Sequence, residues 1–424
     1  MNLSNWLIFR HRNFGILWLG QLTSRIGTFV SYVALLMLVY QVTGSNLKTG
    51  ITGIFQWLPG TLVGLYAGAL IDRYSKKQIM IWTDILRALV SFLVPVLLLL
   101  GRLEIWHIYL IAGMTSLGNA FFQPAEMAII PELVKDKDDL NKANAVARTT
   151  IQIGGIVGPP LGALLMTLWG PGSAFVVDGA TFVLSAISLA LIRTEKIAKA
   201  VESATHIWED IMEGLRLIGR NKPLHAILLS CIAVNFTYYP LPILLPAISG
   251  RHFWDNFPGF NAAFIFSGFT AALTVGKVLA SLTIMWFDSV KQLKYFIYYS
   301  LFLIALSVAC VGLSPILSLS FVAMAIIGYG GLVTEVRIVS YIQTIFPEQL
   351  LGRVFSVIIT IAFGTVPLSI GVAGWLADLW GPTAVLIGLG VGLVATGAGI
   401  MLARLLEDDE IVSTSQTAVF LNKY

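Results

Sequence analysis

Charged side chains within long apolar stretches are the residues of this sequence best placed to do chemistry. Arg25, Glu126, Asp178, Glu335 and Arg337 each lie in a run of mostly apolar residues. An ionisable group at membrane depth is costly, so it usually serves a function or pairs with another charge. A carboxylate beside a dry cavity can load and release a proton. The predicted proton-coupling residues are Glu335, Glu126 and Asp178.

A fixed ion pair is the competing interpretation of these charges. Glu126 with Arg148, or Glu335 with Arg25, would hold two helices together and move no proton. Glu335 and Arg337 are two residues apart, a step of about 200° around a helix, so they face opposite sides and do not readily pair. Proton carriage and fixed pairing both stay open for Glu335, and pairing is favoured for Glu126.

Aromatic and amide side chains in the same stretches suit a binding cavity. Apolar and aromatic walls with a few polar groups fit an amphipathic, cationic ligand. Each aromatic residue taken alone is more often packed in the interior or turned to lipid. The predicted cavity residues are Arg25, Gln21, Phe29, Tyr32, Asn119, Gln123, Asn235, Tyr238, Tyr239 and Arg337.

No pattern for catalysis accompanies these residues. Gly276-Lys277 is followed by Val278 and lacks the upstream glycine of a phosphate-binding loop. The two cysteines, Cys231 and Cys310, both lie in apolar segments, and no Cys/His spacing suggests zinc. We therefore expect no enzyme, no cofactor and no metal, and the energy for transport must come from an ion gradient or from the substrate's own gradient.

The elements that position these residues must be membrane helices. The 424 residues are 57% hydrophobic and 12% charged, with a mean hydropathy of +0.82, whereas soluble domains carry about 25% charged residues. A bilayer-spanning helix needs about 20 apolar residues. The sequence predicts an all-α membrane protein with twelve transmembrane helices, at 14–41, 49–71, 78–100, 105–128, 142–168, 173–192, 223–249, 261–286, 295–313, 316–345, 353–377 and 383–404.

The distribution of lysine and arginine orients these helices. The odd-numbered gaps contain Lys48, Arg102 and Arg251, and the other side carries many more basic residues. The positive-inside rule places the basic side and both termini in the cytoplasm. No cleavable signal peptide is expected, because the first apolar run is too long. We expect a multi-pass protein of a bacterial-type plasma membrane, monomeric, with partners limited to a small-molecule substrate, protons and the bilayer, and with no nucleic acid.

An internal repeat divides the helices six and six. Pro131-Glu132-Leu133 and Leu168-Trp169-Gly170-Pro171 recur as Pro347-Glu348-Gln349-Leu350 and Leu379-Trp380-Gly381-Pro382. Similar halves related by an axis along the membrane normal are a transporter architecture. The predicted divisions are a first half at 1–192, a cytoplasmic linker with an amphipathic helix at 193–222, a second half at 223–406 and a cytoplasmic tail at 407–424.

The loop after the second predicted helix resembles the signature loop of the major facilitator superfamily. It has a glycine, an Asp-Arg pair four residues on, and then two basic residues. In that family the loop contacts the start of the eleventh helix, here near Gly352-Arg353, and latches the cytoplasmic side shut. The resemblance, together with a nearby Asp/Arg pair three residues apart, predicts a conformational latch of Gly68, Asp72, Arg73, Lys76, Lys77, Asp84 and Arg87.

The fifth predicted helix resembles the antiporter motif of the superfamily's drug exporters. Its glycine repeat ends in Gly-Pro-x-x-Gly, with Ala163 in place of the family's final glycine. Glycines let helices approach closely, and prolines remove backbone donors and bend the helix. The motif residues are Gly154, Gly158, Pro159 and Gly162.

Further short motifs resemble the macrolide-efflux and enterobactin-exporter branch of the superfamily. They are Asp84-Ile85-Leu86-Arg87, Phe122-Gln123-Pro124-Ala125, Ala143-Asn144-Ala145 and Gly352-Arg353-Val354. Many drug/proton antiporters carry an arginine shortly before a glycine in the fourth helix, but here Met114-Thr115-Ser116-Leu117 precede Gly118. The usual coupling residue is therefore absent, and coupling must reside elsewhere.

The resemblance implies a secondary active exporter of lipophilic or amphipathic small molecules, such as macrolide-like drugs, working by proton antiport and alternating access. A siderophore exporter and a lysophospholipid transporter are the alternatives of the same kind. A membrane receptor or scaffold is the alternative that transports nothing, and the repeat and the latch loop argue against it.

Overall fold

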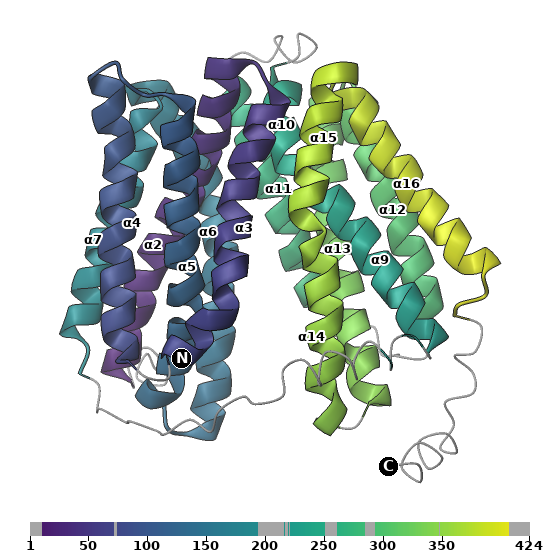
Figure 1. Cartoon of the computed structure of the whole chain (residues 1–424), viewed down its shortest axis with the longest axis horizontal. Coiled ribbons are helices and arrows are strands. Elements are labelled where there is room, and N and C mark those ends of the chain that lie inside the picture. The colour runs from purple at the N-terminus through teal and green to yellow at the C-terminus, as the bar shows by residue number, and fades with distance from the viewer. Residues whose placement is uncertain are drawn as a thin grey trace. The chain divides into compact units, whose positions relative to one another are not determined.

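The computed structural model describes residues 11–71, 74–193, 216, 219, 221–250, 261–284, 293–346 and 348–406. Within these ranges every regular element is a helix. The helices are α2 (Arg12–Thr43), α3 (Asn46–Ile71), α4 (Lys76–Leu99), α5 (Ile105–Leu133), α6 (Lys137–Trp169), α7 (Gly172–Leu191), α9 (Lys222–Tyr238), α10 (Leu241–Ser249), α11 (Ala262–Thr283), α12 (Leu293–Leu313), α13 (Leu317–Ile345), α14 (Glu348–Gly364), α15 (Val366–Trp380) and α16 (Pro382–Leu402) (Figure 1).

The predicted twelve-helix membrane fold is confirmed. Ten segments of the described chain are long and apolar enough to cross a bilayer, and α3 and α5 have the length of a span, with 26 and 29 residues. Two spans are interrupted: α9 and α10 meet at Tyr239-Pro240, and α14 and α15 meet at Thr365, two residues before Pro367. Proline lacks the backbone donor and crowds the preceding turn, which accounts for both breaks.

The repeated Leu-Trp-Gly-Pro motif folds in the same way twice. Gly170 has φ 79° and donates its N–H to Met166 O at 3.0 Å, and Gly381 has φ 82° and donates to Ala377 O at 3.0 Å. Only glycine adopts this positive φ without strain. In each case a proline directly follows the glycine where the next helix begins. The sequence repeat is therefore a structural repeat that reverses the chain between two spans.

The chain forms two compact units, residues 1–202 with 245–271 and residues 203–244 with 272–424. In the first unit α2 packs against both α6 and α7, α3 packs against α5, and α4 packs against α5 and α7. In the second unit α12 packs against α13 and α16, and α9 packs against α14, α15 and α16. The predicted linker at 193–222 and tail at 407–424 lie almost wholly outside the described residues.

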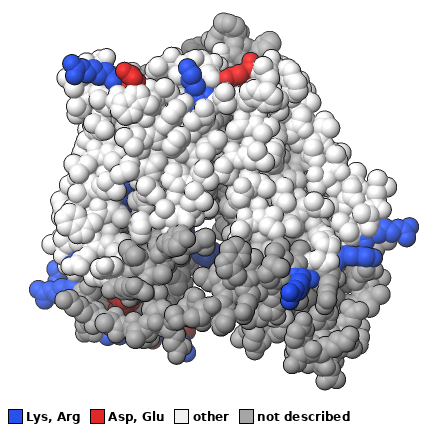
Figure 2. All heavy atoms as spheres, viewed as in Figure 1, with Lys and Arg blue, Asp and Glu red and all other residues white. Residues whose placement is uncertain are grey.

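The surface of the described helices is apolar where a soluble protein would be charged. Leu99 is 88% exposed, Leu402 80% and Trp169 70%. On the visible face of the first unit, charged side chains gather near the helix ends and the surface between them is largely uncharged (Figure 2). Lipid tails solvate such a surface as well as a protein core does, so helix contacts must come from close packing and from polar pairs.

Candidate functional site

The first polar contact in the interior of the first unit joins α2 to α5. Arg25 Nη2 donates to Glu126 Oε2 at 2.6 Å, and the two side chains are 16% and 15% exposed. A charge-assisted bond of this length is strong where water is scarce. Glu126 is therefore paired in this structure with Arg25 and not with Arg148, which is exposed, and its role in proton coupling stays a prediction.

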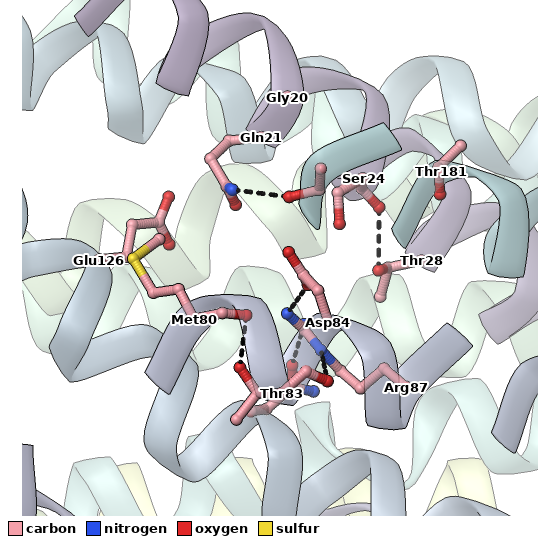
Figure 3. Close-up of polar contacts among 12 residues, drawn as sticks. Gly20, Gln21, Ser24, Thr28, Met80, Thr83, Asp84, Arg87, Glu126 and Thr181 are labelled. Carbon is pink, nitrogen blue, oxygen red and sulfur yellow. Dashed lines mark hydrogen bonds and ion pairs between the residues drawn. The ribbon is translucent and has the colours of Figure 1, made fainter. Parts of the chain in front are cut away.

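A second pair lies deeper, on α4. Arg87 Nη2 donates to Asp84 Oδ1 and Arg87 Nη1 donates to Asn119 Oδ1 at 2.8 Å, so the guanidinium joins α4 to α5 (Figure 3). Its carbon lies 4.2 Å from the ring centroid of Phe122 and 4.5 Å from that of Phe182. Asp84 is 0% exposed and Arg87 3%. The predicted latch role of this pair stays a prediction, and its observed contacts hold three helices of one unit together.

Asp178 on α7 is a further buried acidic group of the first unit. It is 3% exposed and its Oδ2 accepts the Ser91 hydroxyl at 2.7 Å. The charges of Asp178, Arg25 and Glu126 all act on Arg87, which is already paired with Asp84. The five groups therefore form one electrostatic cluster of two guanidinium groups and three carboxyl groups, with one carboxyl group in excess. We call these five residues the buried charge cluster.

Predicted cavity residues on α2 serve different purposes. Gln21 is 4% exposed and its amide donates to the Ser185 hydroxyl of α7 at 3.1 Å. Tyr32 is half-buried and makes contacts of its own. Gln123, on α5, is exposed. Gln21 therefore bridges helices, whereas Gln123 has the exposure that a ligand contact needs.

The glycines of the fifth-helix motif form the contact between α6 and α2. A Cβ on Gly158 would lie 2.5 Å from Phe29 Cβ and 2.9 Å from Ile26 O, and one on Gly162 would lie 2.8 Å from Val30 O. On Gly154 it would meet the Phe29 ring at 3.0 Å. The motif thus lets the two helices touch at backbone distance, as small residues do in membrane helix pairs.

The basic residues of the signature loop hold α4 to its neighbours. Lys76 pairs with Glu132 at the end of α5. Lys77 Nζ donates to Ala190 O at 2.9 Å and Ile192 O at 2.7 Å, where α7 ends. Of the remaining parts of the predicted latch, Asp72 and Arg73 lie outside the described residues, and only the helical backbone is described at Gly68, Gly352 and Arg353.

The second unit carries an aromatic group on α9. The Tyr238 and Tyr239 rings meet edge to face with centroids 5.7 Å apart, and Tyr239 meets Phe363 of α14 at 6.0 Å. Lys277 Nζ of α11 lies 4.8 Å from the Tyr238 ring centroid. One turn earlier, Asn235 Nδ2 donates to Ala362 O at 3.0 Å. Tyr238, Tyr239 and Phe363 therefore form an aromatic group with a cation beside it, and their place in the wall of a binding cavity stays a prediction.

Glu335 and Arg337 face opposite sides of α13, as their spacing predicts. Glu335 is exposed, whereas Arg337 is 8% exposed with its guanidinium carbon 4.8 Å from the Phe296 ring centroid of α12. The Glu335 carboxylate lies near enough to Tyr239 and Lys277 for its charge to act on both. Of the three predicted proton-coupling residues, Glu335 is the exposed one, while Glu126 is paired and Asp178 is buried.

Several contacts went unpredicted. Glu132 appeared in the sequence only as part of a repeat, yet it pairs with Lys76. Lys277 has no charged partner within a turn of its own helix, which was the available signal for a long-range role. Ser91 and Ser185 gave no signal, because a serine in a span usually bonds its own helix.

An apolar groove of about 500 Å³ lies on the second unit between α9, α15 and α16. Two threonine hydroxyls line it, and both donate within their own helices, Thr237 to Ala233 O and Thr396 to Gly392 O. Apart from the indole N–H of Trp380, the side chains that line the groove therefore offer a ligand little hydrogen-bonding capacity.

Known proteins resemble the chain over nearly its whole length. Macrolide efflux protein A of Streptococcus pyogenes is 26% identical over 383 residues, covering 88% of this chain and 91% of the relative. Multidrug efflux pump Tap of Mycolicibacterium fortuitum is 29% identical over 401 residues, covering 92% and 95%.

Solved structures share the fold. The crystal structure of nucleoside transporter NupG matches with a TM-score of 0.71 at 14% identity, covering 91% of this chain and 98% of that one. A bacterial homologue of the human lysosomal transporter Spinster matches with a TM-score of 0.69 at 15% identity, covering 94% and 98%.

The family model described as transmembrane secretion effector matches residues 3–421. With the twelve-helix fold, the repeated half and the glycine contact between α6 and α2, this match establishes that the chain belongs to the transmembrane secretion effector family of major facilitator superfamily transporters.

Proposed function

We propose that this transporter exports lipophilic or amphipathic small molecules from the cytoplasm by proton antiport and alternating access. The observation that carries the proposal is Glu335, a carboxylate that stays exposed about ten residues from the cytoplasmic end of a 29-residue apolar helix. An exposed carboxylate at that depth is costly unless it exchanges a proton or binds a cation. The named activities of the relatives, macrolide efflux and multidrug efflux, support the direction and the substrate class.

The site around Glu335 suits an amphipathic ligand. Tyr238, Tyr239 and Phe363 offer ring edges and faces, and Asn235 supplies an amide beside them. Aromatic faces attract lipophilic cations, and the carboxylate strengthens that attraction when it is ionised. A proton and a cationic ligand would then compete for one carboxylate, which is the simplest form of antiport.

The buried charge cluster of the first unit is a second place to hold a proton. Two guanidinium groups balance only two of its three carboxyl groups. An uncompensated charge in an apolar interior is expensive, so the cluster favours holding one proton. The cluster sits within one compact unit, and we assign it to keeping that unit rigid while the coupling proton moves at Glu335.

The orientation and the boundaries of the parts complete the proposal. Both termini lie in the cytoplasm, the protein works as a monomer in the plasma membrane, and the halves are 1–192 and 223–406, joined by the linker at 193–222. The strong excess of lysine and arginine in the even-numbered gaps supports this orientation.

Accumulation assays in cells test the proposal. Cells that express the protein should accumulate less of a lipophilic cationic dye and of a macrolide than cells that express Glu335→Gln. With an uncoupler present, cells that express the protein and cells that express the variant should accumulate the same amounts. Equal accumulation with and without the protein across a broad panel of compounds would overturn the export proposal, and an uncoupler-insensitive difference would overturn proton coupling.

A further inference from the structure

Lys277 places a positive charge within an apolar helix, and the sequence assigns it no role. Its side chain is half-buried, and its Nζ lies 4.8 Å from the Tyr238 ring centroid, with the Tyr238 hydroxyl also in contact. A lysine at membrane depth needs a counter-charge or a water-filled surrounding. Tyr238 is neutral, so the ring and the hydroxyl account for only part of what stabilises the ammonium.

The counter-charge comes from α13. Helices α11 and α13 touch directly beside Lys277: a Cβ on Gly276 would lie 1.8 Å from Ala325 O, and one on Gly328 would lie 1.9 Å from Leu273 O. Glu335 lies two turns further along α13, and its charge acts on Lys277. One ammonium and one carboxylate therefore share the same part of the second unit.

The titratable groups around this pair come from three helices. Helix α9 contributes Cys231, Tyr238 and Tyr239, and α11 contributes Lys277. Arg337, on α13 itself, is directed at Phe296 and away from Glu335. Near neutral pH the tyrosines and the cysteine carry no charge. Among these groups the net charge around Glu335 is thus set by two residues, Lys277 and Glu335.

We propose that Lys277 makes this a binding site for lipophilic cations that empties when Glu335 takes up a proton. The proposal rests on the proposed function, in which Glu335 exchanges the coupling proton. With Glu335 ionised the pair is neutral overall, and a bound cation is attracted to the exposed carboxylate and to the faces of the tyrosine rings. With Glu335 protonated the ammonium leaves a net charge of one, which repels the bound cation. Without Lys277 the protonated site would be neutral and would retain its ligand on the aromatic faces.

Binding of a permanent cation to the purified full-length protein in lipid nanodiscs tests this inference. Tetraphenylphosphonium is a suitable probe because its charge does not change with pH, and triphenylphosphine oxide is its neutral counterpart. For the unaltered protein, the affinity for the cation should fall by about tenfold or more from alkaline to acidic pH, the effect of one unit charge at close range at an effective dielectric constant of about 20. The affinity for the neutral compound should not change with pH.

Three variants separate the possible causes. Lys277→Gln should bind the cation more tightly than the unaltered protein, by about tenfold or more, at both pH values, because one positive charge is gone, and should therefore stay occupied at acidic pH. Lys277→Arg should bind as the unaltered protein does. Lys48→Gln, which removes an exposed lysine on α3, should behave as the unaltered protein does. Where Lys277→Gln does not fold, Lys277→Met keeps the apolar stem and takes its place.

The outcomes distinguish this inference from the proposed function. Unchanged affinity for the cation at acidic pH in Lys277→Gln, with loss of the pH dependence in Glu335→Gln, would overturn the role of Lys277 and leave Glu335 as the proton site. Unchanged pH dependence in Glu335→Gln would overturn the proposed proton site itself. An unaltered protein that does not bind tetraphenylphosphonium at alkaline pH would overturn the cation site.

Discussion

The contact of α6 with α2 at Gly158 makes a sharp prediction about what the fifth-helix motif does. In Gly158→Ala the new methyl carbon would lie 2.5 Å from Phe29 Cβ and 2.9 Å from Ile26 O. Neither atom is the free end of a flexible side chain, because one begins a side chain and the other is a backbone oxygen. The methyl group therefore fits only if the two helices move apart.

The loss in free energy of unfolding can be estimated from what overpacking and helix propensity contribute. Forcing a methyl group into a close-packed contact costs about 1–3 kcal/mol, and glycine-to-alanine replacement returns up to about 1 kcal/mol through helix propensity. The closest distances rank the three motif positions: 2.5 Å at Gly158, 2.8 Å at Gly162 and 3.0 Å at Gly154. We expect a net loss of roughly 1–2 kcal/mol for Gly158→Ala and a smaller loss for Gly162→Ala. The smallest loss is expected for Gly154→Ala, where the Phe29 ring at 3.0 Å can turn aside and the Arg25 backbone lies 3.2 Å away.

Thermal unfolding of the purified variants in detergent measures these differences. A loss of 1 kcal/mol lowers the melting temperature by about 2–4 °C in a domain of 150–250 residues, the size of one half of this chain. Gly399→Ala is the matched control, because nothing lies within 4 Å of its new Cβ and it should be neutral or slightly stabilising. If Gly158→Ala and Gly399→Ala have the same melting temperature, α6 and α2 do not meet as described.

Two further predictions concern the buried charges, each measured by the fraction of folded protein recovered in detergent and by its melting temperature. Arg87→Met should lower the free energy of unfolding by about 3–5 kcal/mol, because it leaves the fully buried Asp84 without its cation. Adding Asp84→Asn in the same chain should restore part of that stability. Additive effects of the two substitutions would contradict the pairing. Arg25→Gln should lower the free energy of unfolding by less, about 1–3 kcal/mol, because the two side chains of that pair are 16% and 15% exposed. Adding Glu126→Gln should recover stability. Further destabilisation would mean that the two residues act independently.

The helices were predictable because each signal for them is local. Hydropathy and length give a span without reference to any other part of the chain, so predicted and observed ends differ by about five residues or fewer. The breaks at Tyr239-Pro240 and Thr365 were not predicted, because a proline in a span bends one helix and interrupts another depending on its neighbours.

The partners of the buried charges were less predictable, because they depend on which helices touch. The sequence offered both Arg25 and Arg148 as arginines in other spans that could pair with Glu126. Only the packing of α2 on α5 determines that the partner is Arg25. Asp84 and Arg87 were expected near the cytoplasmic loop, yet they lie roughly 12–17 Å into α4 at 1.5 Å per residue. Asp84 and Arg87, three residues apart on one helix, neutralise each other's charge. The pair can therefore be buried, although an aspartate or an arginine alone is usually exposed.

Export coupled to protons at Glu335 is the central claim, and a pH gradient imposed on proteoliposomes tests it most directly. Liposomes containing the purified protein and loaded with a lipophilic cationic dye should release the dye faster when the outer solution supplies the protons, and Glu335→Gln should remove the effect of the gradient. Release by Glu335→Gln that responds to the gradient as the unaltered protein does would contradict the account.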